Sequence, residues 1–218
     1  MAPARPMLTV RRATRDNAGP LIALLAEAFL QGPVGEWLVP NIRERRVVYH
    51  RYFKVVLHHA QRHGYVDTTD NLAGVAIWYS RTEAPVAAPS YQYELMNATG
   101  KYAPRFLLLD ALFEAHRPRI PHDYLAYVAV DPDRQSCGIG SVLLGSAHWR
   151  LDARNRPAYL EASNERNRDL YARLGYHPGP PLNLPNAGPP IWRMWRGQPN
   201  GGVSAQFPPA ELMHRRPL

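Results

Sequence analysis

The 218-residue chain carries a formal net charge of +8, but its basic residues are dispersed along the sequence, so we expect no nucleic-acid partner. Its length suits one domain with a sizeable core, and because no apolar run approaches the ~20 residues that span a bilayer, we expect no membrane partner. A single cysteine excludes an internal disulfide, and the N-terminus lacks the apolar stretch of a signal peptide, so the sequence predicts a cytoplasmic protein.

The first half of the chain predicts alternating strands and helices. Apolar residues alternate near the start, as in a short strand, and then repeat at helical spacing. Asn41 is a good cap for a second helix, and Asp70 and Asn71 are turn residues between two strand-like runs. In chain order, we expect a strand at 8–12, a helix at 21–29, a loop at 31–40, a helix at 41–62, antiparallel strands at 65–68 and 72–80, and two helical segments between 91 and 114.

Histidines in this half of the chain are the obvious candidates for a metal or for acid–base chemistry. His59 and His63 have the spacing of a metal-binding pair on a helix, but the glutamate that metalloproteases place beside the first histidine is absent, so we expect no metal site. His116 is either an acid or base, or an exposed or capping residue, and the second role is the default for a histidine near a helix end.

The most informative stretch runs from Tyr124 to Leu144. Its first seven residues are almost continuously apolar, which is typical of a central strand covered on both faces. A turn signal at 131–133, Gly138 and Gly140 follow, and then an apolar pattern with helical spacing begins. A loop of this kind directs backbone N–H groups and the positive end of the helix dipole at one place, which suits a pyrophosphate. On the glycines alone, a tight turn without a ligand is equally acceptable.

Two better-known phosphate loops are excluded by the residues after these glycines. The nucleoside-triphosphate loop needs a lysine followed by serine or threonine, whereas Gly140 is followed by Ser141 and Val142. The dinucleotide fingerprint needs a third glycine where Leu143 stands.

The rest of the chain predicts a strand–helix–strand pattern followed by a tail. A buried strand is expected at 158–162, and Asn164 starts a helix that ends at Leu174 before Gly175. Tyr176 begins a short strand. After it, we expect a proline-rich loop at 178–190, a last strand at 191–196, and a flexible tail rich in proline and glycine at 197–218, which leaves residues 1–196 as one domain.

Three stretches resemble the GCN5-related N-acetyltransferase (GNAT) family. They are Gln135-x-x-Gly138-x-Gly140 after a strand, which is similar to the family's acyl-CoA loop, the strand 159–163, and Asn167-x-x-x-Tyr171-x-x-x-Gly175-Tyr176, which is similar to its final helix. The resemblance spans about residues 8–196. It implies an α/β (α+β) fold with a central mixed, mostly antiparallel twisted sheet, a splayed central strand and helices on both faces.

Within the family, the chain looks most like puromycin N-acetyltransferase and related actinomycete enzymes, at 12–16, 74–78, 116–118, 135–141 and 160–163. This implies acetyl-CoA as the donor and a primary amine of a small molecule, such as an antibiotic or secondary metabolite, as the acceptor, in a monomer or homodimer. Acetylation of a peptide or protein amine and a non-catalytic acyl-CoA-binding module are the alternatives. The sequence does not identify the acceptor.

The resemblance also assigns roles to individual residues. Glu161 is similar in position to the glutamate assigned as general base in the puromycin enzyme, and burial at the end of a strand would raise its pKa toward a useful value. Its alternative role is a structural ion pair with a nearby arginine. Tyr171 matches the general-acid tyrosine, which we expect to act chiefly as a hydrogen-bond donor, and its alternative is a core aromatic. The expected cofactor-binding residues are Val128, Ala129, Val130, Arg134, Gln135, Ser136, Cys137, Gly138, Ile139, Gly140, Ser141, Asn167 and Tyr171.

The acceptor pocket is expected to come from the first helix and its loop, the second helix and residues 91–116. Aromatic residues there fit either a flat or apolar acceptor or an ordinary core; they are Trp37, Tyr49, Tyr52, Phe53, Tyr91 and Tyr93. One departure from the family pattern is Ser136-Cys137, where a glycine or a basic residue is usual, and it places a thiol beside the expected cofactor.

Overall fold

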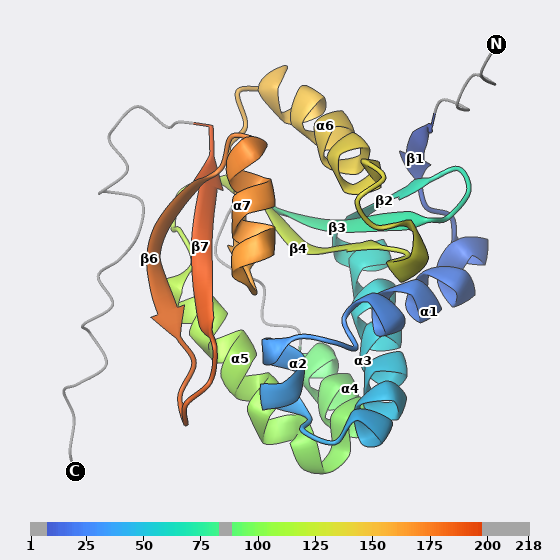
Figure 1. The fold of residues 1–218 in the computed structure, drawn as a ribbon, viewed down its shortest axis with the longest axis vertical. Coiled ribbons are helices and arrows are strands. Elements are labelled where there is room, and N and C mark those ends of the chain that lie inside the picture. The colour runs from blue at the N-terminus through green and yellow to red at the C-terminus, as the bar shows by residue number, and fades with distance from the viewer. Residues whose placement is uncertain (1–7, 83–88, 198–218) are drawn as a thin grey trace.

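The computed structural model describes residues 8–82 and 89–197, so the predicted tail beyond Gly197 lies outside the described residues. One sheet runs through the protein in the order β1-β2-β3-β4-β5-β7-β6 (Figure 1). Its strands are β1 (Val10–Arg12), β2 (Tyr65–Thr69), β3 (Gly74–Arg81), β4 (His122–Val130), β5 (Ala158–Ala162), β6 (His177–Asn183) and β7 (Pro190–Arg196). Among the strands of the described residues, only β4 and β5 pair in parallel, which confirms the predicted mixed, mostly antiparallel sheet.

Helices cover both faces of this sheet, as the sequence predicts. They are α1 (Ala18–Ala28), α2 (Pro33–Leu38), α3 (Ile42–His63), α4 (Pro89–Thr99), α5 (Ala103–His116), α6 (Ile139–Asp152) and α7 (Glu165–Arg173). In Figure 1, α6 lies above β3 and β4, α7 lies beside β7, and α1 to α5 lie mostly below β3 and β4. The buried side chains divide accordingly into a larger cluster on the α1–α5 face and a smaller one on the α6–α7 face. Within the described ranges, no helix is both long and apolar enough to cross a membrane.

The helix α3 forms where the sequence predicts it because its ends are well marked. The Asn41 side chain accepts hydrogen bonds from the backbone N–H groups of Arg43 (2.9 Å) and Glu44 (3.1 Å), which are otherwise unpaired at a helix start. Gly64 follows directly after the last helical residue. The buried side chains of α3, such as Phe53, pack into the larger core cluster.

The loop predicted at 31–40 is wrong in part, because it contains the short helix α2. Pro33 stands at the first helical position, where its missing N–H is no loss, and Gly32 takes a φ of +129° that other residues rarely adopt. The side chain of the buried Arg45 in α3 binds the backbone at both ends of this segment. Its guanidinium donates to the carbonyls of Leu30 (2.8 Å) and Val39 (2.7 Å).

The proline-rich loop predicted at 178–190 is also wrong, because its first part is the strand β6. Prolines lack the N–H that a central strand needs, but β6 lies at the edge of the sheet and pairs only with β7. The pairing of β6 with β7 also shifts its register between Pro178 and Pro181. Edge position, which the sequence does not reveal, thus explains the error.

The strands β4 and β5 separate along the length of β4. They pair at three positions only, from Asp123 with Ala158 to Leu125 with Leu160. Beyond Leu125, β4 continues to Val130 paired with β3 alone. The central strand is therefore splayed, as the resemblance implies, and the edge of β4 that faces β5 is left without a strand partner from Ala126 onward in the described structure.

Replacing Gly74 by alanine should lower the free energy of unfolding by about 1–3 kcal/mol. A Cβ at this position of β3 would lie 2.7 Å from Leu143 Cδ1 and 2.8 Å from Ile139 Cγ2, and both are buried side chains of α6. Denaturant unfolding of Gly74→Ala measures this loss. The matched control is Gly19→Ala in α1, whose added Cβ meets nothing within 4 Å. Equal stabilities of the two variants would contradict the tight packing of α6 on β3.

Candidate active site

The glycine loop between β4 and α6 presents its backbone to solvent. Ser136 and Gly138 both take left-handed conformations, with φ of +62° and +82°, and residues 132–138 are exposed. Ile139 anchors the start of α6 in the core. No side chain among the described residues caps this helix, so its first N–H groups are available to an anion.

Gly140 is not required by the packing of the protein itself. Its backbone φ is not positive, and an added Cβ would lie 3.7 Å from Val130 Cγ2, an ordinary contact. Gly138, by contrast, has a backbone conformation that a side chain would strain. A glycine at position 140 therefore fits a close approach from outside the protein.

Two arginines lie at this loop. Arg166, in the first turn of α7, donates from Nη2 to the hydroxyl of Ser136 (3.2 Å), while Arg134 lies 3.5 Å from Asp131. The sequence singled out Arg134 but not Arg166. The helix start after Asn164 was recognised, but only the fold shows that this start reaches the glycine loop.

The remaining expected cofactor residues lie along the open edge of β4 and on α7. Val128 packs against the cluster on the α6–α7 face, which also contains Tyr171, and Val130 packs below α6. The side chain of Asn164 caps α7 by accepting from the backbone N–H of Asn167 (2.8 Å). Cys137 is exposed. The structure thus brings the glycine loop, the splayed strand and the start of α7 together around the same end of β4.

Glu161 is the last residue but one of β5 and follows directly after the pairing with β4 ends at Leu160. It lies on the same side of the strand as Tyr159, and Tyr124 is the parallel neighbour of Tyr159, with ring centroids 5.9 Å apart. Burial raises the pKa of the partly buried Glu161 to about 7, although a hydrogen bond from the Tyr124 hydroxyl works in the opposite direction. The carboxylate is therefore a usable base near neutral pH.

Two arginines lie near the Glu161 carboxylate, but their charges do not cancel the effect of burial on its pKa. Arg193 of β7 is the strand partner of Glu161 and is fully buried, and Arg117 follows α5. Their positive charges lower the pKa of Glu161, but both effects are smaller than that of burial. Arg193 was not singled out from the sequence, because only the strand register places it opposite Glu161.

Tyr171 lies on the other face of the sheet from Glu161. It is buried in the α6–α7 cluster with Leu160 and Ala162, and its ring lies 6.0 Å from that of Tyr176. Burial raises the pKa of its phenol, which favours the protonated form that donates a hydrogen bond. Both residues lie close to the end of the β4–β5 pairing, since Glu161 follows Leu160 and Tyr171 shares a cluster with it.

The structure also places His116 and the aromatic residues that the sequence suggested as candidates. His116 is buried, and its Nδ1 lies 2.8 Å from the carbonyl of Leu112, so it is a capping rather than an exposed histidine. Tyr49, Tyr52 and Phe53 are buried in the core, whereas Tyr93 is 69% exposed.

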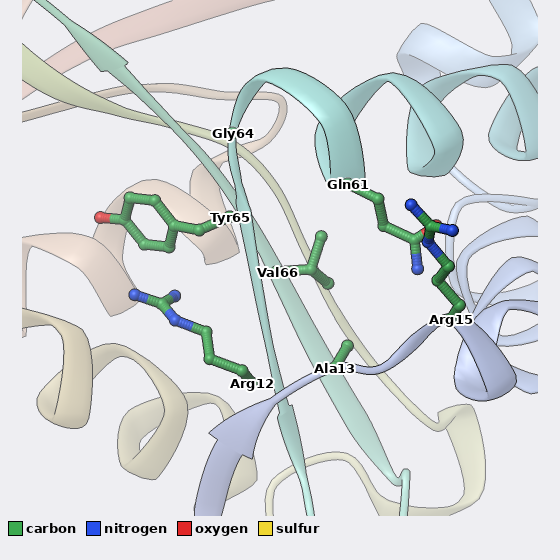
Figure 2. Close-up of a pocket in the computed structure, with 7 residues that line it drawn as sticks. All are labelled: Arg12, Ala13, Arg15, Gln61, Gly64, Tyr65 and Val66. Atoms are coloured by element: carbon green, nitrogen blue, oxygen red, sulfur yellow. The ribbon is translucent and has the colours of Figure 1, made fainter.

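A surface depression of about 220 Å³ lies at β1, β2 and the end of α3, and none of the expected site residues lines it. Figure 2 shows Arg12 and Tyr65 on one side of it and Gln61 and Arg15 on the other. The guanidinium of Arg12 stacks 4.2 Å above the Tyr65 ring and pairs with Asp67 at 2.6 Å. This depression is lined by no carboxylate, histidine or cysteine, which separates it from the site at β4 and β5.

Known proteins resemble this chain in sequence and in fold. Residues 109–178 match the family model of the acetyltransferase (GNAT) domain, a segment that includes the glycine loop, Glu161 and Tyr171. The fold is similar to that of a Corynebacterium glutamicum protein described as histone acetyltransferase HPA2 and related acetyltransferase, with a TM-score of 0.69 and 26% identity over 89% of this chain and 99% of that chain.

Two more distant structures share the fold alone. A putative acetyltransferase of the GNAT family from Desulfovibrio desulfuricans has 17% identity and a TM-score of 0.53, over 87% of this chain and 98% of that one. Arylalkylamine N-acetyltransferase 2 from Aedes aegypti has 12% identity and a TM-score of 0.57, over 88% of this chain and 100% of that one.

Proposed function

We propose that this N-acetyltransferase, whose residues 109–178 match the GNAT domain model, acetylates a primary amine of a small molecule such as an antibiotic or another secondary metabolite. The observation that carries the proposal is Glu161, a carboxylate with a pKa of about 7 placed where β4 and β5 separate. The sequence resemblance to puromycin N-acetyltransferase and related actinomycete enzymes supports the small-molecule acceptor.

The donor, acetyl-CoA, supplies an activated acetyl thioester when it is bound. The exposed loop at 132–138 and the uncapped start of α6 fit its diphosphate, because the first N–H groups of the helix are available there and Gly140 leaves room for close approach. Arg166 adds positive charge beside Ser136. The unpaired edge of β4 at 128–130, together with Asn167, would hold the pantetheine arm by backbone and side-chain hydrogen bonds.

The acceptor amine must lose a proton before it can attack, because an ammonium group has no lone pair. An alkylamine has a pKa near that of lysine, about 10.4, so only a small fraction is neutral at pH 7. A carboxylate with a pKa of about 7 holds this proton far better than an ordinary glutamate. In our proposal Glu161 accepts the proton, and the hydroxyl of Tyr124 orients the carboxylate.

Tyr171 would stabilise the sulfur of the departing thiolate. A thiol has a pKa of about 8.5 and a phenol about 10, so complete proton transfer from tyrosine is uphill by roughly 2 kcal/mol even before burial. Burial raises the pKa of Tyr171 further and makes this transfer less favourable. We therefore assign Tyr171 the role of a hydrogen-bond donor to developing negative charge.

A panel of amines offered with acetyl-CoA, with release of free thiol as the readout, tests the proposed function. Small primary amines should be acetylated faster than peptide amines. A preference for peptide amines, or no turnover of any amine, would overturn the proposal.

In the same assay, Tyr171→Phe should lower kcat by about 10- to 100-fold, because one hydrogen bond to developing charge is lost. Tyr93→Phe, which alters an exposed tyrosine on α4, is the matched control and should keep wild-type turnover. Full activity of Tyr171→Phe would show that its hydroxyl takes no part in the reaction.

A further inference from the structure

The surface depression between β1, β2 and the end of α3 lies outside the site at β4 and β5. The charged side chains that line it, Arg12 and Arg15, are both positive. We propose that the depression binds a small anion through a phosphate or carboxylate group, which makes it a second ligand site of the protein. This inference does not depend on the proposed function, because none of the residues assigned to acetyl transfer lines the depression.

The guanidinium of Arg12 is held in place on one side of the depression. It donates from Nη1 to Asp67 Oδ1 at 2.6 Å and stacks 4.2 Å from the centroid of the Tyr65 ring. The Arg12 side chain is nevertheless 52% exposed, so its other N–H groups are accessible to a ligand. Because this side chain is already ordered, little conformational entropy would be lost when an anion binds to it.

The carboxylate behind Arg12 does not cancel the positive charge of the depression. Asp67 is buried, and it also accepts a hydrogen bond from Arg150 of α6. Two positive charges thus share one negative charge, which leaves these three side chains with a net charge of +1. Asp16, next to Arg15 in the sequence, is exposed but does not line the depression, and it forms no ion pair among the described residues.

The opposite side of the depression adds a second cation. Arg15 lies in the short 3-10 helix Arg15–Asn17 after β1, and its exposed side chain makes no hydrogen bond or ion pair within the ranges that the structure describes. Figure 2 shows its guanidinium beside the amide of Gln61. Gln61 Nε2 donates to the carbonyl of Thr14 at 3.4 Å, which joins the end of α3 to the segment that carries Arg15. The charge of Arg15 is therefore available to a ligand.

The residues between the two basic sides are small and apolar. Figure 2 shows Ala13 and Val66 there, and the backbone N–H of Ala13 donates to the carbonyl of Val66 at 2.9 Å, which fixes this part of the lining. The volume of about 220 Å³ is below the roughly 300–1,000 Å³ of pockets for drug-sized ligands. The depression therefore suits a small anion, and the arginines supply the charge that would recognise it.

Titration of the protein with inorganic phosphate and, separately, with glutarate tests the inference, with backbone amide NMR shifts as the readout at constant ionic strength. Saturable shifts should appear at residues 12–15 and 61–66, whereas binding at the glycine loop would shift residues 136–140 instead. Saturation at the depression by either anion supports the inference, and the stronger of the two identifies the preferred group. Glutaramide, which has the shape of glutarate but no charge, should cause no saturable shift.

The variant Arg15→Gln should weaken this binding about 10-fold, because a charge-assisted contact is lost. Arg15→Lys keeps the charge and should lose less. The matched control is Arg43→Gln, which removes the same charge from an exposed side chain at the start of α3 and should keep the wild-type affinity. Absence of saturable shifts at 12–15 and 61–66 with both anions, or equal affinities of Arg15→Gln and the wild type, overturns the inference.

Discussion

The variant Glu161→Gln should show a kcat/KM for its amine acceptor about 10²- to 10⁴-fold below that of the wild type, the usual range for loss of a general base. Glutamine keeps the size of the side chain and its hydrogen bonding but cannot take the proton of the ammonium. The effect should fall mainly on kcat, because the acceptor still binds. The control is Glu165→Gln, which removes an exposed carboxylate at the start of α7 and should leave turnover unchanged.

The pH profile adds a second test of the same residue. Because the base must be ionised, kcat/KM of the wild type should rise as the pH rises through about 7 and then level off on that limb. The limb should be absent from the residual activity of Glu161→Gln. A variant that keeps more than a tenth of wild-type activity, or an unchanged limb, would show that another group takes the proton.

The raised pKa of Glu161 also has a consequence for stability. Its pKa in the folded protein, about 7, lies above the ordinary value of 4.5, so the folded state binds the proton more tightly. The stability that this group contributes is complete below about pH 4.5 and is lost as the pH rises through 7. Relative to the wild type, Glu161→Gln should therefore gain up to about 3 kcal/mol of unfolding free energy between pH 4.5 and pH 8.

The second large effect is expected from Gly140→Ala, which should weaken the binding of coenzyme A by about 10- to 100-fold. The added methyl group meets only Val130 within the protein, at an ordinary 3.7 Å, so the fold should tolerate it. On the ligand side it should keep the diphosphate from the backbone, and overpacking by one methyl group costs about 1–3 kcal/mol. Titration calorimetry measures the change.

Gly145→Ala is the matched control, since it adds the same methyl group to the same helix. Its Cβ meets nothing within 4 Å, so affinity should stay at the wild-type value and the helix should be stabilised by about 0.5–1 kcal/mol. Equal affinities of the two variants for coenzyme A would mean that the cofactor does not approach Gly140.

The sequence predicted those parts of the fold in which local signals and tertiary context agree. The helix α3 has a cap at Asn41 and a stop at Gly64, and the segment from β4 to α6 has a continuous apolar run followed by glycines. The prediction failed at α2 and at β6, where glycine and proline usually break structure. There, the anchoring of the chain by Arg45 and the edge position of β6 override the local signal.

The candidate site shows the same division. Glu161 and Tyr171 were named from local motifs, and their roles stay predictions. The groups around Glu161 were not found, because strand register brings Arg193 and Tyr124 to it from distant parts of the chain.

The account depends most on the glycine loop as the binding site of the cofactor diphosphate, and a crystal structure of the protein with bound coenzyme A tests this directly. We expect diphosphate oxygens within hydrogen-bonding distance of backbone N–H groups between residues 136 and 140, with the pantetheine arm along the open edge of β4. A structure in which the diphosphate binds elsewhere and these N–H groups face solvent would contradict the account.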